Sequence, residues 1–207
     1  MIAIIDYDAG NIRSVEKALN YLGEEAIITR DCNELLCAEK VILPGVGAFK
    51  DAMHNIRKYD LEKVILEIVE RKTPFLGICL GLQLLFESSE ENPGIDGLGL
   101  LKGEILRIPE VNQIKIPHMG WNSLEFPRSG KLFQGVEADS FVYFVHSYYL
   151  SAKDSSIVTA TTEYGTKIHA SVEQDNLFAC QFHPEKSSAT GLKILNNFVK
   201  IGREVDR

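Results

Sequence analysis

The segment TPFLGICLGLQLLFE, residues 73–87, constrains the fold of this chain more than any other. Its apolar run over 74–78 is typical of a buried strand, and an apolar helix follows it directly. Cys79 lies at the turn between them, flanked by Gly77 and Gly81. We expect both glycines to be required, because a Cβ atom at either position would collide where strand and helix approach each other. Such a turn projects its central side chain clear of the backbone and is typical of catalytic nucleophiles.

Cys79 itself can be interpreted in two ways. As a nucleophile it would lie at the start of a helix, where the positive end of the helix dipole favours the reactive thiolate. As a core residue it would be one more small, buried side chain. The pattern Gly-x-Cys-x-Gly does not decide between the two, so the interpretation depends on other segments.

Length and composition favour one globular domain over residues 1–207. The chain is long enough for one substantial core, and its 45% hydrophobic and 25% charged residues are ordinary. No repeat, composition break or low-complexity linker divides it. The net charge of −7, without a basic run, argues against nucleic acid as a partner. No apolar stretch reaches the roughly 20 residues that cross a bilayer, so we expect no membrane partner.

The N-terminus and the cysteines favour a cytoplasmic location. The first residues, MIAIID, lack the basic segment and cleavage site of a signal peptide and are typical of a core strand. The cysteines have no disulfide-framework spacing, which favours a reducing compartment. Cys32 and Cys37 have the wrong gap for a C-x-x-C motif, and no Cys/His pair follows at finger spacing. We therefore predict no metal and no cofactor. The four cysteines are Cys32, Cys37, Cys79 and Cys180.

The order of strands and helices predicts an α/β fold. In the first half, strands alternate with helices, which indicates a parallel, doubly wound arrangement. We expect an open, mostly parallel central sheet with helices on both faces and additional antiparallel strands in the C-terminal half. The expected strands of the first half are 2–5, 26–29, 41–43 and 74–78, and its helices are 12–22, 48–58 and 61–71. Later strands are expected at 104–108, 113–116, 121–126, 141–150, 157–161, 168–172 and 177–181, before a helix over 190–204.

A second informative segment, FACQFHPE over 178–185, contains His183 and Glu185. In an extended chain, residues i and i+2 point the same way, about 7 Å apart at Cα. This spacing suits a carboxylate that holds an imidazole in one tautomer while the other ring nitrogen faces a nucleophile. Taken alone, a surface His-Pro-Glu turn is the simpler explanation. Together with Cys79 upstream, the segment favours a Cys-His-Glu triad.

A third segment, PGVG over 44–47, follows the third predicted strand. Acyl-transfer enzymes direct backbone N–H groups at the developing oxyanion. Where the nucleophile lies on a strand-to-helix turn, one donor is the next residue, here Leu80, and another comes from a glycine-rich loop. A dinucleotide-binding motif is the competing interpretation, but the position of its third glycine is occupied by Lys50. That motif also follows the first strand of a fold, whereas this loop follows the third predicted strand. We therefore expect an oxyanion loop.

Together these segments resemble the class I (triad) glutamine amidotransferases. More narrowly, the chain resembles the glutaminase subunits of imidazole glycerol phosphate synthases over about residues 1–203. The segments that carry this narrower resemblance are DYDAGNI at 6–12, LPGVGAF at 43–49, GLGL at 97–100, KIPHMGWN at 115–122 and YFVHSYY at 143–149.

The resemblance implies that the chain hydrolyses L-glutamine. Cys79 would attack the side-chain carboxamide, and Glu185 would orient His183. His183 would protonate the departing ammonia and then activate water to hydrolyse the γ-glutamyl thioester.

The resemblance also implies where the substrate would be held. Val46 or Gly47, together with Leu80, would supply the oxyanion donors, after reorientation of a peptide in the loop. By similarity, Gln83 and the backbone of Ser147 and Tyr148 would hold the amino-acid end of glutamine. A locally satisfied Gln83 and an aromatic core strand over 141–150 are the simpler alternatives. We interpret His146 as structural and assign no role to His54, His118 or His169.

A partner follows from the resemblance: the cyclase subunit of imidazole glycerol phosphate synthase, a (β/α)8 barrel. It would use the ammonia to make imidazole glycerol phosphate and aminoimidazole carboxamide ribotide in L-histidine biosynthesis. Free ammonia in neutral water is mostly non-nucleophilic ammonium, so it has to pass through a dry channel. We therefore expect a heterodimer whose interface surrounds the Cys79 turn. The candidate interface residues are Asn11, Ile12, Trp121, Tyr143 and Lys186.

Three alternatives remain at this stage. A paralogous glutaminase could feed ammonia to another synthetase, such as a sugar amidotransferase. A cysteine hydrolase or peptidase could use a similar turn. A glutaminase without activity could act as a binding module, although Cys79, His183 and Glu185 are all present.

Overall fold

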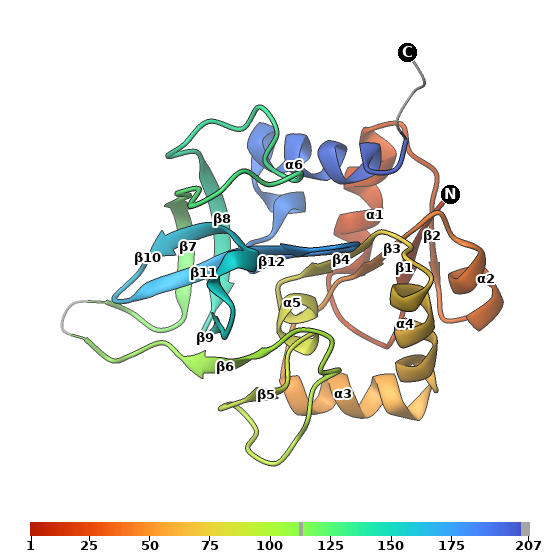
Figure 1. Ribbon diagram of the computed structural model, residues 1–207, viewed down its shortest axis with the longest axis horizontal. Helices are drawn as coiled ribbons and strands as arrows, with labels where there is room; N and C mark the ends of the chain where they lie inside the picture. The colour runs from red at the N-terminus through yellow and green to blue at the C-terminus, as the bar shows by residue number, and fades with distance from the viewer. Residues whose placement is uncertain (112–113, 204–207) are drawn as a thin grey trace.

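A seven-stranded sheet forms the centre of the molecule, in the order β10-β11-β12-β4-β3-β1-β2 (Figure 1). The computed structural model describes residues 1–111 and 114–203. Strands β2, β1, β3, β4 and β12 are parallel, and β11 and β10 extend the sheet antiparallel. The mostly parallel sheet and its antiparallel extension are therefore confirmed. The strands are β1 (Ile2–Ile5), β2 (Ala26–Thr29), β3 (Lys40–Leu43), β4 (Phe75–Ile78), β10 (Val158–Glu163), β11 (Lys167–Gln174) and β12 (Leu177–Cys180).

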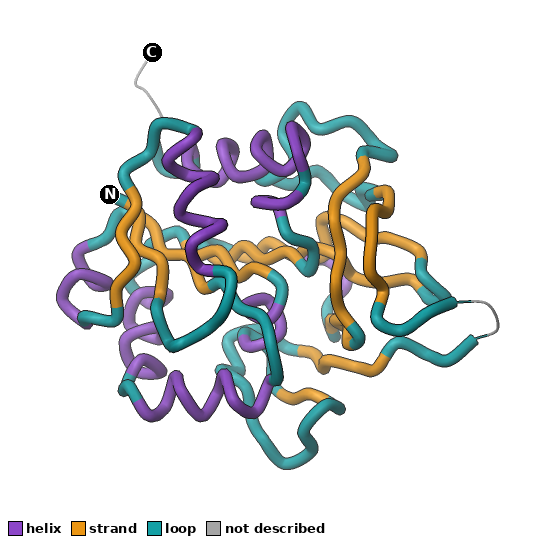
Figure 2. Tube along the Cα trace, turned by 180° about the vertical axis from the view of Figure 1, so that it is seen from behind, coloured by secondary structure: helices purple, strands orange, loops and turns teal. Residues whose placement is uncertain are grey.

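Helices cover both faces of this sheet. Helices α1 (Ile12–Tyr21) and α6 (Ser188–Lys200) lie over one face, and the remaining helices lie on the other side (Figures 1 and 2). No helix within residues 1–111 and 114–203 has the length and apolar character needed to cross a bilayer. The other helices are α2 (Cys32–Cys37), α3 (Phe49–Lys58), α4 (Leu61–Glu70) and α5 (Leu80–Leu84), with short 3-10 turns η1 (Ser155–Ile157) and η2 (Pro184–Lys186).

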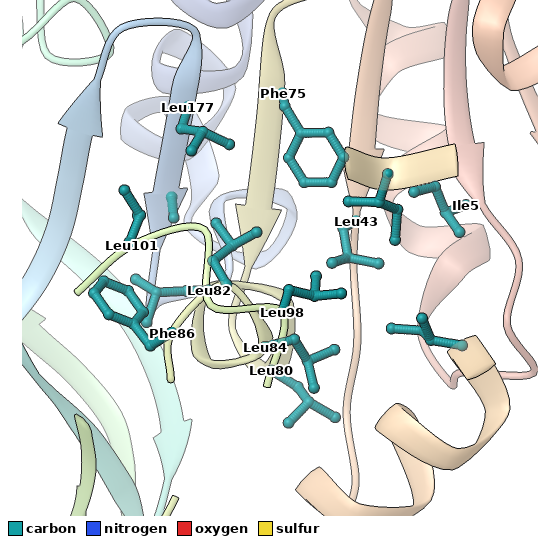
Figure 3. Close-up of a cluster of buried hydrophobic side chains, with 14 of the residues drawn as sticks. Ile5, Leu43, Phe75, Leu80, Leu82, Leu84, Phe86, Leu98, Leu101 and Leu177 are labelled. Carbon is teal, nitrogen blue, oxygen red and sulfur yellow. The ribbon is translucent and has the colours of Figure 1, made fainter. Parts of the chain in front are cut away.

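Strand periodicity divides the core into two clusters. Successive side chains of a strand point to opposite faces, so Ile2 and Ile4 pack with α1 and α6 while Ala3 and Ile5 pack with α3 and α4. All four residues of β1 are buried, as expected for a strand covered on both faces. Figure 3 shows the second cluster, in which Leu43 and the Phe75 ring converge with side chains of α5. The site-bearing turn after β4 is thus anchored in the core.

Two small sheets flank the centre. The first contains β5 (Ser88–Ser89), β6 (Gly103–Arg107) and β9 (Tyr148–Ala152). The second pairs β7 (His118–Ser123) with β8 (Phe141–His146). Strands β7 and β8 run at a steep angle to the strands of the central sheet (Figure 2). The single strand predicted over 141–150 is wrong, because the chain breaks at Ser147 and its halves join different sheets. Since apolar residues continue on both sides of the break, the sequence pattern does not reveal it.

Other boundaries also differ from the prediction. Residues 114–116 form no strand, and residue 113 lies outside the described residues. The strand predicted at 121–126 begins and ends three residues earlier. The last helix begins at Ser188, and residue 204 likewise lies outside the described residues. Helix α2 was not predicted, although its N-cap Asp31 accepts hydrogen bonds from the backbone of Asn33 and Glu34.

Candidate active site

Cys79 lies at the carboxyl end of β4, immediately before α5. Its backbone is in a positive-φ conformation (φ 54°, ψ −107°), which is strained for a residue with a side chain. Its N–H donates to the carbonyl of Cys180 on β12 at 2.8 Å, which holds the turn against the neighbouring strand. A Cβ on Gly77 would lie 2.8 Å from the Gly81 oxygen, and one on Gly81 would lie 1.8 Å from the Leu43 oxygen. Both glycines are therefore required, as expected from the sequence.

His183 and Glu185 lie just beyond the end of β12, the strand beside β4. Nδ1 of His183 lies 2.7 Å from Oε1 of Glu185, and the two side chains are 1% and 0% exposed. Since an ionised carboxylate only accepts, Nδ1 carries the proton and Nε2 is the free nitrogen. Nε2 is buried and has no hydrogen-bond partner of normal geometry in the described part of the chain. The ring is thus held from one side and free to exchange a proton on the other.

Electrostatics couple His183 to Cys79. Burial alone would lower the pKa of His183, but its interactions with Cys79 and Glu185 outweigh burial and raise the pKa to about 9. A protonated His183, held by a carboxylate beside a sulfur atom, can give a proton to a leaving group while the sulfur acts as the nucleophile.

Asn11 also contacts the His183–Glu185 pair. Its Nδ2 donates to Oε1 of Glu185 at 2.6 Å, the oxygen that also accepts from His183. Asn11 occupies the N-cap position of α1, but its side chain makes no capping hydrogen bond there. The side chain therefore supports Glu185 instead of the helix.

A cavity of about 330 Å³ opens beside Cys79. Its walls come from the loop after β3, the start of α5 and the segment that joins β8 to β9. Its volume falls at the small end of ligand pockets, which occupy about 300–1,000 Å³. Seven residues expected at the site line it together: Val46, Gly47, Cys79, Leu80, Gln83, Ser147 and Tyr148. The lining also includes Glu91, Pro117, Val145 and His146.

Two glutamine side chains link this cavity to the sulfur atom. Nε2 of Gln83 donates to the carbonyl of Tyr148 and to Oε1 of Gln181, both at 3.1 Å. Nε2 of Gln181 in turn donates to Sγ of Cys79 at 3.7 Å. Gln181 is fully buried, so this donor is held in a dry environment where it stabilises negative charge on sulfur.

The loop predicted to supply oxyanion donors lines the cavity, but one of the predicted donors already has an acceptor. The N–H of Leu80 donates to the Gly45 carbonyl at 3.3 Å and is therefore already occupied. The loop is held by Tyr7, whose buried hydroxyl donates to the Pro44 carbonyl at 2.7 Å. Rotation of the peptide between Gly45 and Val46 would remove this acceptor and present the Val46 N–H instead. Gly47, at φ 106°, supplies the adjacent backbone freedom.

The residues predicted at a partner interface occupy different environments. Trp121 is 50% exposed, and its ring lies edge-on to Tyr143 at a centroid distance of 6.1 Å. Lys186 is also exposed. Ile12 is only 8% exposed and packs in the core from the inner face of α1, so little of its side chain is available to a partner. The sequence prediction missed two exposed neighbours of Trp121 on the β7–β8 pair, Met119 and Phe141.

Sequence reasoning missed four contributors to the site: the contact of Asn11 with Glu185, and the side chains of Tyr7, Gln181 and Glu91. A signal existed for Gln181, because it lies two residues before His183 and so shares its face in an extended segment. Glu91 lies in an irregular loop, where its carboxylate accepts from the Phe49 N–H at 2.9 Å. No periodic pattern marks such a position.

Comparison with known proteins gives consistent results. The sequence profile of the family described as glutamine amidotransferase class-I matches residues 3–201. A protein from Moorella thermoacetica named imidazole glycerol phosphate synthase subunit HisH is 53% identical, over 98% of this chain and 95% of its own length. The protein of that name from Methanocaldococcus jannaschii is 50% identical, over 97% and 100%.

Solved structures support the same fold. A glutamine amidotransferase superimposes with a TM-score of 0.77 at 21% identity, covering 98% of this chain and all of that one. PurLQS from Thermotoga maritima gives a TM-score of 0.76 at 22% identity, covering 97% of each chain. At these identities the likeness concerns the fold alone.

Proposed function

Because this chain belongs to the class I glutamine amidotransferase family, we propose that the cavity beside Cys79 is where it hydrolyses glutamine. The chain is the glutaminase subunit of an imidazole glycerol phosphate synthase and acts in histidine biosynthesis. One observation carries the assignment of the site. The buried, unpartnered Nε2 of His183 belongs to a ring that Glu185 holds and that is coupled to Cys79 at the cavity.

The first half of the reaction releases ammonia. The thiolate of Cys79 attacks the side-chain carbonyl carbon of glutamine, and the C=O electron pair moves onto oxygen. When the tetrahedral intermediate collapses, the C–N bond breaks and His183 gives its Nε2 proton to the departing nitrogen. The products are ammonia and a γ-glutamyl thioester on Cys79.

The oxyanion of this intermediate requires N–H donors. We assign Leu80 as one donor and Val46 as the other, with Gly47 as the alternative. Since Leu80 donates to the Gly45 carbonyl at 3.3 Å, this hydrogen bond has to break before Leu80 can bind the oxyanion. Rotation of the Gly45–Val46 peptide completes the donor pair. The rotation disrupts one weak hydrogen bond and leaves the contact between Tyr7 and Pro44 in place.

The second half of the reaction regenerates the enzyme. His183, now neutral at Nε2, takes a proton from a water molecule that attacks the thioester carbonyl. Collapse of the second intermediate expels the Cys79 thiolate and leaves glutamate. Glu185 keeps the proton on Nδ1 throughout, because it accepts that hydrogen bond at 2.7 Å.

The amino-acid end of glutamine carries one positive and one negative group, and the cavity offers partners for both. The carboxylate of Glu91 at the cavity wall suits the ammonium group. Backbone N–H groups of Ser147 and Tyr148 suit the carboxylate, and Gln83 supports this segment through the Tyr148 carbonyl.

The ammonia passes to the cyclase subunit with which this chain forms a heterodimer. The exposed aromatic side chains of Trp121 and Phe141 suit a protein interface near the site, and we assign Lys186 to its edge. We also propose a cytoplasmic location. It is supported by the biosynthetic role of the relatives and by four free cysteines.

Mixing the chain with the cyclase subunit and assaying synthesis tests the proposal. Glutamine should support formation of imidazole glycerol phosphate, and Cys79→Ala should abolish that while leaving ammonia-dependent synthesis intact. Equal glutamine-dependent synthesis with Cys79→Ala would contradict the site assignment. Ammonia release without synthesis would instead favour another synthetase as acceptor.

A further inference from the structure

Two buried histidines connect the wall of the cavity to the β7–β8 pair. His118 on β7 and His146 on β8 lie directly opposite each other in the ladder and are 3% and 6% exposed. Nδ1 of His118 lies 3.0 Å from Nε2 of His146, and Nδ1 of His146 lies 2.8 Å from the Tyr148 carbonyl. The reaction described above uses neither ring.

The hydrogen bonds determine which nitrogen of each ring carries a proton. A carbonyl only accepts, so His146 carries its proton on Nδ1. In the neutral ring, Nε2 of His146 is then an acceptor, which requires a proton on Nδ1 of His118. Nε2 of His118 is left as an acceptor, 3.4 Å from Nδ2 of Asn122.

The orientation of the Asn122 amide supports this assignment. Its Nδ2 donates to the Glu163 carbonyl at 3.0 Å, and its Oδ1 accepts from the Ser123 N–H at 2.9 Å. A proton added to either histidine would set two N–H donors against each other along this chain. Burial also lowers the pKa of His118 to about 4 and that of His146 to about 3. Both rings are therefore neutral and fixed in one tautomer.

The rings are also held in place by packing. His118 stacks between Phe144, at a centroid distance of 4.7 Å, and Tyr164, at 3.9 Å. The Tyr164 hydroxyl donates to the Lys115 carbonyl at 2.7 Å. His118 therefore cannot rotate away from His146 without disturbing two aromatic contacts.

The Tyr148 carbonyl is the acceptor at the end of this chain of hydrogen bonds. It accepts from His146 at 2.8 Å and from Gln83 at 3.1 Å, which fills both lone pairs. The preceding carbonyl, of Ser147, accepts from Ile108 on β6 at 3.0 Å. Neighbouring residues of a strand direct their backbone groups to opposite sides, so both the N–H and the C=O of Tyr148 point away from β6. The Tyr148 N–H shares a planar peptide group with the Ser147 carbonyl, which Ile108 holds, while the Tyr148 carbonyl belongs to the next peptide group, which His146 and Gln83 hold. The backbone of Tyr148 is thus held on both sides of its Cα, and loss of the His146 bond would loosen one of these two sides.

We propose that His146, held by His118, is a positioning residue that orients the Tyr148 backbone to bind the amino-acid end of glutamine. The proposal rests on the function proposed above for the Ser147–Tyr148 segment. Both rings are neutral: His118 donates a hydrogen bond to His146, and His146 donates one to the Tyr148 carbonyl. Neither ring takes part in proton transfer at Cys79.

The tautomers can be read directly, without any activity. Long-range ¹H–¹⁵N correlation spectra of the full chain labelled with ¹⁵N-histidine should show both rings neutral at pH 7, with the proton on Nδ1. A cationic ring, or a proton on Nε2 of either residue, would overturn the proposal. Variants of each histidine assign the signals.

Kinetics in the complex with the cyclase subunit test the positioning role. His146→Leu removes the donor and should raise KM for glutamine roughly fivefold to tenfold, the effect of one buried hydrogen bond, with kcat within about twofold of wild type. His146→Asn, whose amide N–H can replace Nδ1–H, should recover most of the loss. His54→Leu, the same substitution on the exposed side of α3, should change nothing.

The nucleophile provides a second readout. In His146→Leu, the rate of Cys79 alkylation by iodoacetamide should not change, because this reagent lacks the amino-acid end of glutamine. Inactivation by a diazoketone analogue of glutamine, which has that end, should be slower. An unchanged KM in His146→Leu, or equal KM values for the Leu and Asn variants, would refute the positioning role. If the wild-type complex hydrolyses no glutamine at all, the proposed function fails instead, and the spectra still report the tautomers.

Discussion

Asn11 Nδ2 donates a hydrogen bond of 2.6 Å to Glu185 Oε1, across a separation of 174 residues in the sequence. The same oxygen accepts from His183 at 2.7 Å. Two donors on one oxygen fix the carboxylate in the plane that the imidazole needs. The loop between β1 and α1 therefore takes part in orienting His183, the proposed catalytic base.

Replacing Asn11 should slow the chemical step. Asn11→Ala removes a hydrogen bond to a charged group, worth about 1.5–3 kcal/mol, so we expect kcat for glutamine hydrolysis to fall about tenfold or more. Asn11→Asp should be slower still, because it places a second carboxylate against Glu185. Steady-state ammonia release measures both, and Asn20→Ala, an exposed position on the same helix, is the matched control. An Asn11→Ala enzyme with wild-type kcat would contradict the orienting role.

His183 should make stability depend on pH in the alkaline range. Its pKa is raised from 6.5 to about 9, so the folded state holds the proton more tightly than the unfolded state. The resulting stabilisation is fully present below pH 6.5 and is lost as the pH rises through about 9. Urea denaturation of wild type and His183→Gln should give a difference in unfolding free energy that shrinks over this window. If the difference in unfolding free energy grew with pH, the pKa of His183 would not be raised in the folded state.

Gly81 should tolerate no side chain. A Cβ there would lie 1.8 Å from the Leu43 carbonyl oxygen, which belongs to the backbone and cannot move alone. We expect Gly81→Ala to lower the free energy of unfolding by about 3 kcal/mol or more. Gly23→Ala is the control, since that position has positive φ but open space and should cost only about 1–2 kcal/mol. Equal losses in the two variants would argue against the steric explanation.

Gln181 should affect the reactivity of the nucleophile. It donates to Sγ of Cys79 at 3.7 Å, so Gln181→Leu should slow alkylation of Cys79 at pH 7 about fivefold. Mass spectrometry of the Cys79 peptide separates this reaction from that of the exposed Cys37. An unchanged rate for Cys79 would mean that the contact has no effect on the thiolate.

The sequence predicted the parts of the site that depend on local geometry. The turn at Cys79 was predictable because Gly77 and Gly81, close to it in sequence, are required where the strand and the helix approach each other. His183 and Glu185 were predictable because an extended chain repeats every two residues. The site residues themselves remain predictions until variants are measured.

Contacts between residues far apart in the sequence have no such local signal. Nothing near Asn11 indicates that it meets Glu185, and the break at Ser147 lies inside continuous apolar sequence. His118 was assigned no role and His146 only a structural one, because only the β7–β8 register brings them together. Contacts of this kind depend on how distant strands pair, and one sequence does not reveal that.

Because β12 is the last strand of the central sheet to be synthesised, the proposed triad can be complete only late in the synthesis of the chain. The ribosome completes β4 and Cys79 long before residues 177–180, so the inner edge of β4 stays unpaired while the second half of the chain is made. His183 and Glu185 follow β12 immediately. With the roles proposed for Cys79 and His183, a nascent or truncated chain that ends before this strand carries the nucleophile without its base. Such a chain should release no ammonia.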